Sequence, residues 1–193
     1  MGHLTLIMGC MFAQKTTELL RQIRRFQSIG YKVLVVNYEA DTRYGENCIA
    51  SHDVDKHPAV CVASLQQLEE KMTLSDFDVV VIDEGQFFPD LFEKVTSWAD
   101  TQPLHIIVCG LDGDSERRPF GDVLRLIPHA EKVERLTAYC AECRDGTIAH
   151  FSKRFAAGAA AATQEQIAVG AGDMYRPVCR RHYLQSYQKN QEK

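Results

Sequence analysis

No segment of this chain is apolar for long enough to cross a membrane, which takes about 18 residues. The apolar run inside Met1–Met8 is short and has no basic residues before it, so the pattern of a secretory signal peptide is missing too. We therefore expect a protein that has no membrane partner and resides in the cytoplasm.

An excess of positive charge is also missing. The 22 lysines and arginines are outnumbered by 26 aspartates and glutamates, which leaves a net charge of −4. A polyanion such as DNA or RNA is therefore not an expected partner. A small anionic ligand is not excluded, because it needs only local positive charge and backbone N–H groups.

The cysteines lack the even number of a disulfide framework. There are seven, and three of them join a histidine in two pairs of identical spacing, Cys140 with Cys143 and Cys179 with His182. Sulfur and imidazole ligands in two such pairs satisfy tetrahedral zinc. Because protein groups fill all four positions, the predicted zinc is structural; the alternative is free cysteines and a surface histidine. The other cysteines are expected to be ordinary core or surface thiols: Cys10, Cys48, Cys61 and Cys109.

Short apolar runs alternate with helical patterns over the first two-thirds of the chain. This order predicts βα units, and so an α/β fold with a parallel sheet flanked by helices. Strands are predicted at Leu4–Met8, Tyr31–Val36, Val79–Ile82 and Leu104–Cys109, helices over Leu19–Phe26, Ser64–Met72 and Pro89–Trp98, a helix end at Gly30, and a polar loop at Asn37–Pro58. The sequence changes character near Ala138, which predicts a nucleotide-binding domain over 1–138 and a small zinc-binding domain over 139–193.

The segment between the first strand and the first helix has the position of a phosphate-binding loop. In the pattern G-x-x-x-x-G-K-[ST], backbone N–H groups close around the phosphates, the lysine reaches the β- and γ-oxygens, and the hydroxyl serves magnesium. Gly9, Lys15 and Thr16 fit this pattern, whereas Gln14 replaces its second glycine and would crowd the phosphates. The alternative is an ordinary turn with a solvated lysine. The candidate phosphate-binding residues are Gly9, Cys10, Met11, Phe12, Ala13, Gln14, Lys15 and Thr16.

Two acids follow the most apolar of the predicted strands. Asp83 and Glu84 come directly after Val79–Ile82, and the carboxyl ends of parallel strands face the ligand crevice. The aspartate would hold magnesium through its water shell, and the glutamate would act as general base toward an attacking hydroxyl. Alternatively, both acids cap a helix or lie in solvent.

Together these motifs resemble the zinc-containing thymidine kinases, over nearly the whole chain from Leu4 to Tyr183. The family loop G-P-M-F-S-G-K-[ST]-T-E-L is similar to residues 9–19, and the family segment D-E-x-Q-F is similar to residues 83–87. Residues 41–44, 111–113 and 119–121 and both cysteine-containing pairs also match. Residues 169–175 resemble the lasso that covers the nucleoside in this family.

The resemblance implies transfer of the ATP γ-phosphate to the 5′-hydroxyl of thymidine or deoxyuridine, with magnesium, by a homotetramer. It implies that Glu84 is the general base. It also assigns magnesium and the phosphates to Thr16, Asp41, Arg43 and Asp83, with the arginine stabilising charge on the transferring group. The implied nucleoside-binding residues are Met11, Phe87, Leu111, Ser115, Phe120, Ser152, Val169, Gly170, Ala171, Gly172, Asp173 and Tyr175.

Two departures from the family pattern leave a second function open. Besides Gln14, Ser115 stands where the family usually has a phenylalanine that packs on the base, a contact worth about 0.5–1.5 kcal/mol. The alternative to an active kinase is therefore a catalytically impaired kinase fold that serves as a binding or assembly subunit. A P-loop ATPase acting on nucleic acid fits worse, because the chain is short and acidic. A zinc ribbon that binds nucleic acid also fits worse, because the region around the cysteine pairs has no interleaved aromatic residues on which bases could stack.

Overall fold

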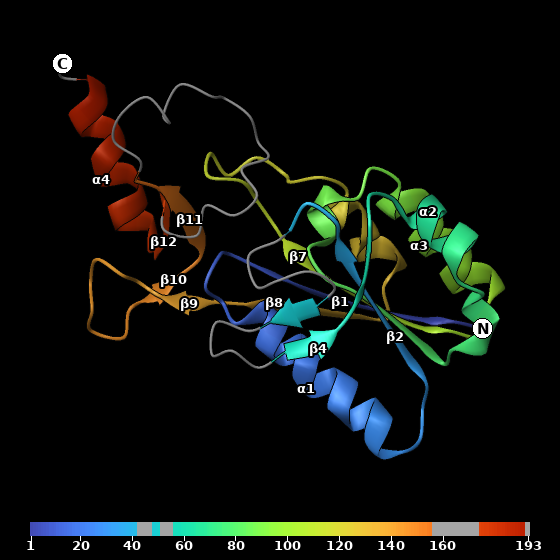
Figure 1. The fold of residues 1–193 in the computed structure, drawn as a ribbon. Coiled ribbons are helices and arrows are strands. Elements are labelled where there is room, and N and C mark those ends of the chain that lie inside the picture. Colours follow the sequence, from blue (N-terminus) through green and yellow to red (C-terminus); the bar gives the residue numbers. More distant parts are fainter. Residues whose placement is uncertain (42–47, 51–55, 156–173, 192–193) are drawn as a thin grey trace.

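The computed structural model describes residues 1–41, 48–50, 56–155 and 174–191, and its largest element is a six-stranded sheet (Figure 1). The strands are β1 (His3–Gly9), β2 (Val33–Tyr38), β5 (Val60–Val62), β6 (Val79–Ile82), β7 (His105–Leu111) and β8 (Lys132–Leu136). They lie in the order β5-β2-β6-β7-β1-β8, and each neighbouring pair is parallel. The predicted α/β fold with a parallel sheet is confirmed.

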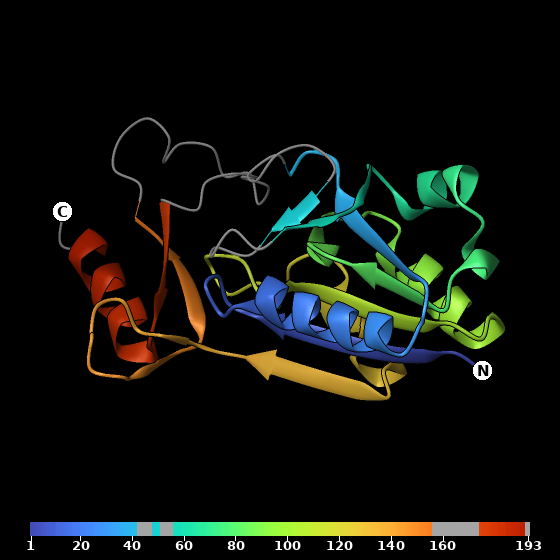
Figure 2. The same cartoon turned by 60° about the horizontal axis from the view of Figure 1, so that its bottom comes forward.

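Helices cover both faces of the sheet (Figure 2). The helix α1 (Lys15–Ser28) packs on one face, and α2 (Leu65–Lys71), α3 (Leu91–Thr101) and the 3-10 helix η3 (Val123–His129) pack on the other. Successive residues of β1 enter different cores, since Leu6 contacts the α2–α3 side and Ile7 the α1 side. A sheet buried on both faces explains why its central strands are nearly continuous apolar runs. Two shorter 3-10 helices are η1 (Leu74–Asp76) and η2 (Gly85–Phe87).

The first helix ends at Ser28, with Ile29 as its C-cap residue, two residues before the glycine at which the sequence predicts its end. Gly30 has a φ of +85°, and its N–H donates to the carbonyl of Gln27 over 3.0 Å. The N–H of Tyr31 donates to the carbonyl of Phe26 over 3.2 Å. These two bonds satisfy carbonyls at the helix end, and they need a left-handed residue that glycine provides without strain.

Two predicted boundaries around β2 are wrong. The predicted strand Tyr31–Val36 begins and ends two residues too early, because β5 pairs with β2 as far as Tyr38. Asn37 does not end the strand, although it is polar; its side chain accepts the N–H of the next residue over 2.9 Å and is buried. The predicted polar loop Asn37–Pro58 also contains the antiparallel pair β3 (Cys48–Ala50) and β4 (Lys56–Pro58).

The helices over the middle of the chain match their predictions more closely. The predicted helix Ser64–Met72 is α2, and the Ser64 hydroxyl caps it by accepting the N–H of Gln67 over 3.2 Å. The predicted helix Pro89–Trp98 begins and ends later, since α3 runs from Leu91 to Thr101 and the proline precedes its N-cap residue.

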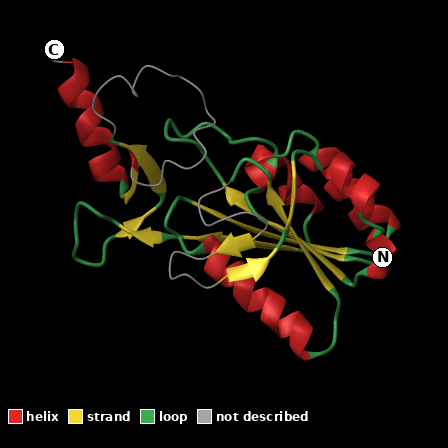
Figure 3. Ribbon diagram, viewed as in Figure 1, coloured by secondary structure: helices red, strands yellow, loops and turns green. Residues whose placement is uncertain are grey.

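A small module lies at the carboxyl end of the large sheet (Figure 3). It consists of β9 (Ala138–Tyr139), β10 (Ile148–Ala149), β11 (Phe151–Arg154), β12 (Tyr175–Val178) and α4 (Arg180–Gln191), with β9–β10 and β11–β12 as antiparallel pairs. Its apolar core includes Cys10 and Ala13, so it packs directly on the loop between β1 and α1. The division at 138/139 stays a prediction. Among the described residues, no helix combines the length and the apolar character of a membrane span.

Candidate active site and metal cluster

The loop between β1 and α1 has a backbone that favours glycine at Gly9, at Phe12, whose φ is 64°, and at Gln14. Gly9 lies so close to the end of β8 that a Cβ atom there would be 2.3 Å from the carbonyl oxygen of Leu136. Gln14 precedes α1 with φ 58° and ψ 34°, a left-handed conformation. Such a conformation strains residues that have a Cβ atom, which explains why the phosphate-loop pattern has glycine at this position.

The lysine and threonine of the loop point to different groups. The Lys15 ammonium donates to the Cys10 carbonyl over 2.9 Å, across the loop. The Thr16 hydroxyl donates to Asp83 Oδ2 over 3.1 Å, and this carboxylate is buried at the end of β6. The structure therefore brings together the hydroxyl and the carboxylate for which the sequence predicts a shared magnesium ion.

The second acid lies beside the first in a constrained position. Glu84 has a φ of 52°, and its N–H donates to Asp83 Oδ1 over 2.9 Å. Gln86 Nε2 donates to Glu84 Oε2 over 2.5 Å. Asp41 is buried just after β2, at the same edge of the sheet. The predicted phosphate ligand Arg43 lies outside the described residues.

Aromatic rings gather beside the acids. The rings of Phe87 and Phe120 meet edge to face, with 5.5 Å between their centroids, and the centroid of the Tyr38 ring lies 5.4 Å from that of Phe87. The N–H of Leu111 donates to Gln86 Oε1 over 2.9 Å, which ties the end of β7 to this group. Three predicted nucleoside-binding residues are thus adjacent to the acids, and Tyr38 is an addition that no sequence motif indicated.

The predicted base-wall residue Ser115 is held by the small module. Its carbonyl accepts the hydroxyl of Tyr183 over 2.7 Å, and that tyrosine directly follows the metal-ligand candidate His182. The guanidinium carbon of Arg117 lies 4.4 Å from the centroid of the Tyr183 ring. No sequence motif indicated a role for this tyrosine, whose side chain connects α4 to the loop after β7.

Two further predicted nucleoside-binding residues contact each other. The Met11 N–H, in the phosphate loop, donates to the hydroxyl of Ser152, which is buried on β11. Tyr175 begins β12 and pairs with Arg154 of β11, so the last residue of the predicted lasso lies beside the end of β11. The remaining lasso residues, Val169, Gly170, Ala171, Gly172 and Asp173, lie outside the described residues.

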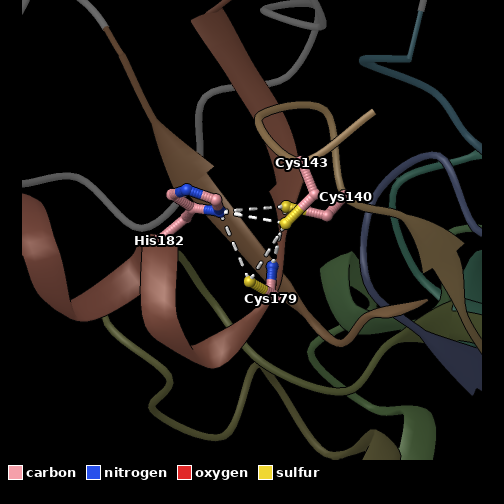
Figure 4. A group of neighbouring side chains, drawn as sticks. All are labelled: Cys140, Cys143, Cys179 and His182. Carbon is pink, nitrogen blue, oxygen red and sulfur yellow. Dashed lines mark hydrogen bonds between the residues drawn. The ribbon is translucent and has the colours of Figure 1, made fainter. Parts of the chain in front are cut away.

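The four predicted metal ligands converge (Figure 4). His182 Nδ1 lies 3.5, 3.3 and 3.4 Å from the sulfurs of Cys140, Cys143 and Cys179, and the last two sulfurs are 3.8 Å apart. A tetrahedral zinc with ordinary bond lengths separates sulfur from nitrogen by about 3.6 Å and sulfur from sulfur by about 3.8 Å. The four ligand atoms therefore have the spacing that a zinc ion requires.

Local hydrogen bonds favour the thiolate form of Cys140, one of the four ligands. Burial raises the pKa of the Cys140 thiol, but the backbone N–H groups of Cys179 and Cys143 outweigh it and lower this pKa to about 6. The thiolate is the form that binds metal. By contrast, burial raises the pKa of Cys10 and Cys109, as expected for ordinary core thiols.

Comparison with known proteins shows the family of this chain. The family model of thymidine kinase matches residues 2–183. Monkeypox virus thymidine kinase is 42% identical over 186 residues, covering 96% of this chain and 98% of the viral protein. The thymidine kinases of vaccinia virus (strain Western Reserve) and variola virus are 42% identical over 185 residues, with the same coverage. These matches favour a kinase over the alternative of an impaired binding subunit, and the chain belongs to the type II thymidine kinase family.

Proposed function

We propose that this protein transfers the γ-phosphate of ATP to the 5′-hydroxyl of thymidine or deoxyuridine. The observation that carries the proposal is the hydrogen bond between the Thr16 hydroxyl and Asp83, with Glu84 adjacent. It joins the end of the phosphate loop to the acidic end of β6, so phosphate, metal and proton acceptor would meet in one place. The names of the viral relatives supply the nucleoside.

The phosphates of ATP would lie in the loop of residues 9–16, against backbone N–H groups and Lys15. Thr16, Asp83 and Asp41 would hold magnesium, because hydroxyl and carboxylate oxygens are the hard ligands that this ion prefers. When bound, magnesium neutralises negative charge on the transferring phosphate. Arg43 would stabilise charge on the same group.

Glu84 would accept the proton of the 5′-hydroxyl as its oxygen attacks the γ-phosphorus. The new bond joins this oxygen to phosphorus, and the bond that breaks joins phosphorus to the β–γ bridging oxygen. ADP then leaves, and the products are ADP and the nucleoside monophosphate. General base catalysis of this kind contributes roughly 10²- to 10⁴-fold to the rate.

The nucleoside would lie against the aromatic group beside the acids. Met11, Phe87, Leu111 and Phe120 would form the walls of its site, with Ser115 and Ser152 at the rim. The lasso from Val169 to Tyr175 would cover the base and contact it through backbone groups.

The cluster of three cysteines and one histidine would hold a structural zinc ion. Zinc would then fix the chain just after β9 relative to the start of α4, and so position the paired strands β11 and β12 beside them. The proposal also includes a homotetramer in the cytoplasm with no nucleic-acid or membrane partner, and domains over 1–138 and 139–193.

The test is formation of thymidylate by the purified protein with ATP, magnesium and thymidine, measured by chromatography. We expect Glu84→Gln to lower kcat by roughly 10²- to 10⁴-fold. The matched control is Glu70→Gln, an exposed carboxylate on α2 whose loss should change nothing. An unaltered protein that makes no thymidylate, or a Glu84→Gln variant with full activity, would overturn the proposal.

A further inference from the structure

The amide of Gln86 connects the proposed general base to the nucleoside wall. Gln86 lies in η2 and is only 4% exposed. Its Oε1 accepts the Leu111 N–H over 2.9 Å, and its Nε2 donates to Glu84 Oε2 over 2.5 Å. Because a backbone N–H can only donate, the bond to Leu111 fixes which end of the amide is oxygen and directs the NH₂ group to the carboxylate.

The surrounding chain leaves room for this amide at two glycines. A Cβ atom on Gly110 would lie 2.8 Å from Gln86 Oε1. A Cβ atom on Gly121, whose φ is +54°, would lie 2.3 Å from the Gln86 carbonyl oxygen. A side chain at either position would displace Gln86. The glycines in β7 and in the turn before η3 therefore leave the space that Gln86 occupies.

A glutamate that acts as a base needs a defined orientation. Its carboxylate ends a flexible side chain, and proton transfer requires an oxygen within hydrogen-bond reach of the hydroxyl. A donor on one oxygen restricts rotation of the whole carboxylate. The same amide also accepts the N–H of Leu111, a proposed wall residue of the nucleoside site. A movement of Leu111 would therefore shift Gln86 and, through it, the carboxylate of Glu84.

We propose that Gln86 is a positioning residue that orients the Glu84 carboxylate for proton transfer. The inference depends on the proposed function, because that function makes Glu84 the base. It assigns Gln86 an effect on the chemical step and no contact with ATP.

The direct test is Gln86→Met, which keeps the length of the side chain and removes both hydrogen bonds. A hydrogen bond to a charged group has an energy that corresponds to roughly a 10- to 100-fold change in rate. We expect kcat to fall by that factor, while the KM for ATP stays within about twofold. A purely structural role would change both, together with the melting temperature, which is measured alongside.

Gln22→Met is the matched control. Gln22 is also a buried glutamine, and its Nε2 donates to the carboxylate of Glu18 over 2.6 Å on α1. This substitution removes the same kind of bond away from the acids and should leave kcat unchanged. If Gln86→Met does not fold, Gly110→Ala replaces it, since the added methyl would push the amide of Gln86; the same selective fall in kcat is expected.

A double-mutant cycle separates this inference from the proposed function. If Gln86 acts through Glu84, Gln86→Met should have no further effect in a Glu84→Gln background. A slowed Glu84→Gln variant combined with unchanged kcat in Gln86→Met, or equal fold-changes from Gln86→Met in both backgrounds, would overturn the positioning role alone. Full activity of Glu84→Gln would overturn the proposed function as well.

Discussion

Replacing Gln14 by glycine is expected to stabilise the protein and to tighten ATP binding. Gln14 has φ 58° and ψ 34° and makes no side-chain cap hydrogen bond to α1, so the substitution removes strain without removing a cap. The left-handed conformation costs a residue with a Cβ atom about 1–2 kcal/mol. Glycine loses about 0.5–1 kcal/mol more conformational freedom on folding.

The difference leaves a net gain of about 0.5–1 kcal/mol in the free energy of unfolding. For a chain of this size it corresponds to a rise of about 1–4 °C in melting temperature, measured by calorimetry. Removing the side chain should also open the loop to phosphate, as the crowding expected from the sequence requires. One regained charge-assisted hydrogen bond would tighten ATP·Mg²⁺ binding by roughly tenfold or more, measured by isothermal titration.

Gln14→Ala is the control that separates strain from crowding. It removes most of the side chain but keeps the Cβ atom, so the left-handed backbone stays strained and the melting temperature should not rise. If alanine stabilised the protein as much as glycine, the strain argument would be refuted. If glycine left the affinity for ATP unchanged, the crowding argument would fail.

Three further predictions concern the metal, the Tyr183 contact and pH. Chelation of zinc, or the substitution Cys143→Ser, is expected to lower the free energy of unfolding by on the order of 5 kcal/mol and to remove the zinc that atomic emission detects. The control Cys61→Ser should change neither quantity. A purified chain without zinc would contradict the cluster's role. Tyr183→Phe removes the hydroxyl that donates to the Ser115 carbonyl and should raise the KM for thymidine by roughly 2- to 10-fold in steady-state assays; an equal rise in the KM for ATP would count against a local effect. Burial, followed by the charge of His3, lowers the pKa of His105, so the unfolded chain binds this proton more readily than the folded one. The contribution of His105 to the free energy of unfolding is therefore fully present above about pH 6.5 and is lost as the pH falls through the lowered pKa of the folded state. In urea unfolding, the stability of His105→Asn should depend less on pH below about pH 6.5 than that of the unaltered protein. The same pH dependence in both proteins would contradict this.

The central strands could be predicted from the sequence because both of their faces are buried. Val79–Ile82 is fully apolar and was predicted with the correct ends. The strand β8 is not predicted, since it lies at the edge of the sheet and three of its five residues are charged, namely Lys132, Glu134 and Arg135. The pair β3–β4 is not predicted, because its strands are only three residues long and lie in a polar stretch.

The parts of the site could be predicted, but not the contacts between them. Fixed spacing identified the metal cluster, and the ends of strands and helices located Thr16 and Asp83. The bonds from Leu111 to Gln86 and from Tyr183 to Ser115 join residues 25 and 68 positions apart. Such contacts depend on how β7, η2 and α4 pack, and no local pattern encodes that packing.

Transfer of labelled phosphate tests the central claim most directly. The unaltered protein, with Gln14 in place, is incubated with magnesium, thymidine and ATP labelled in its γ-phosphate. We predict that the label appears in thymidylate at the rate at which ADP forms. Formation of ADP without labelled thymidylate, or no consumption of ATP at all, would contradict the account.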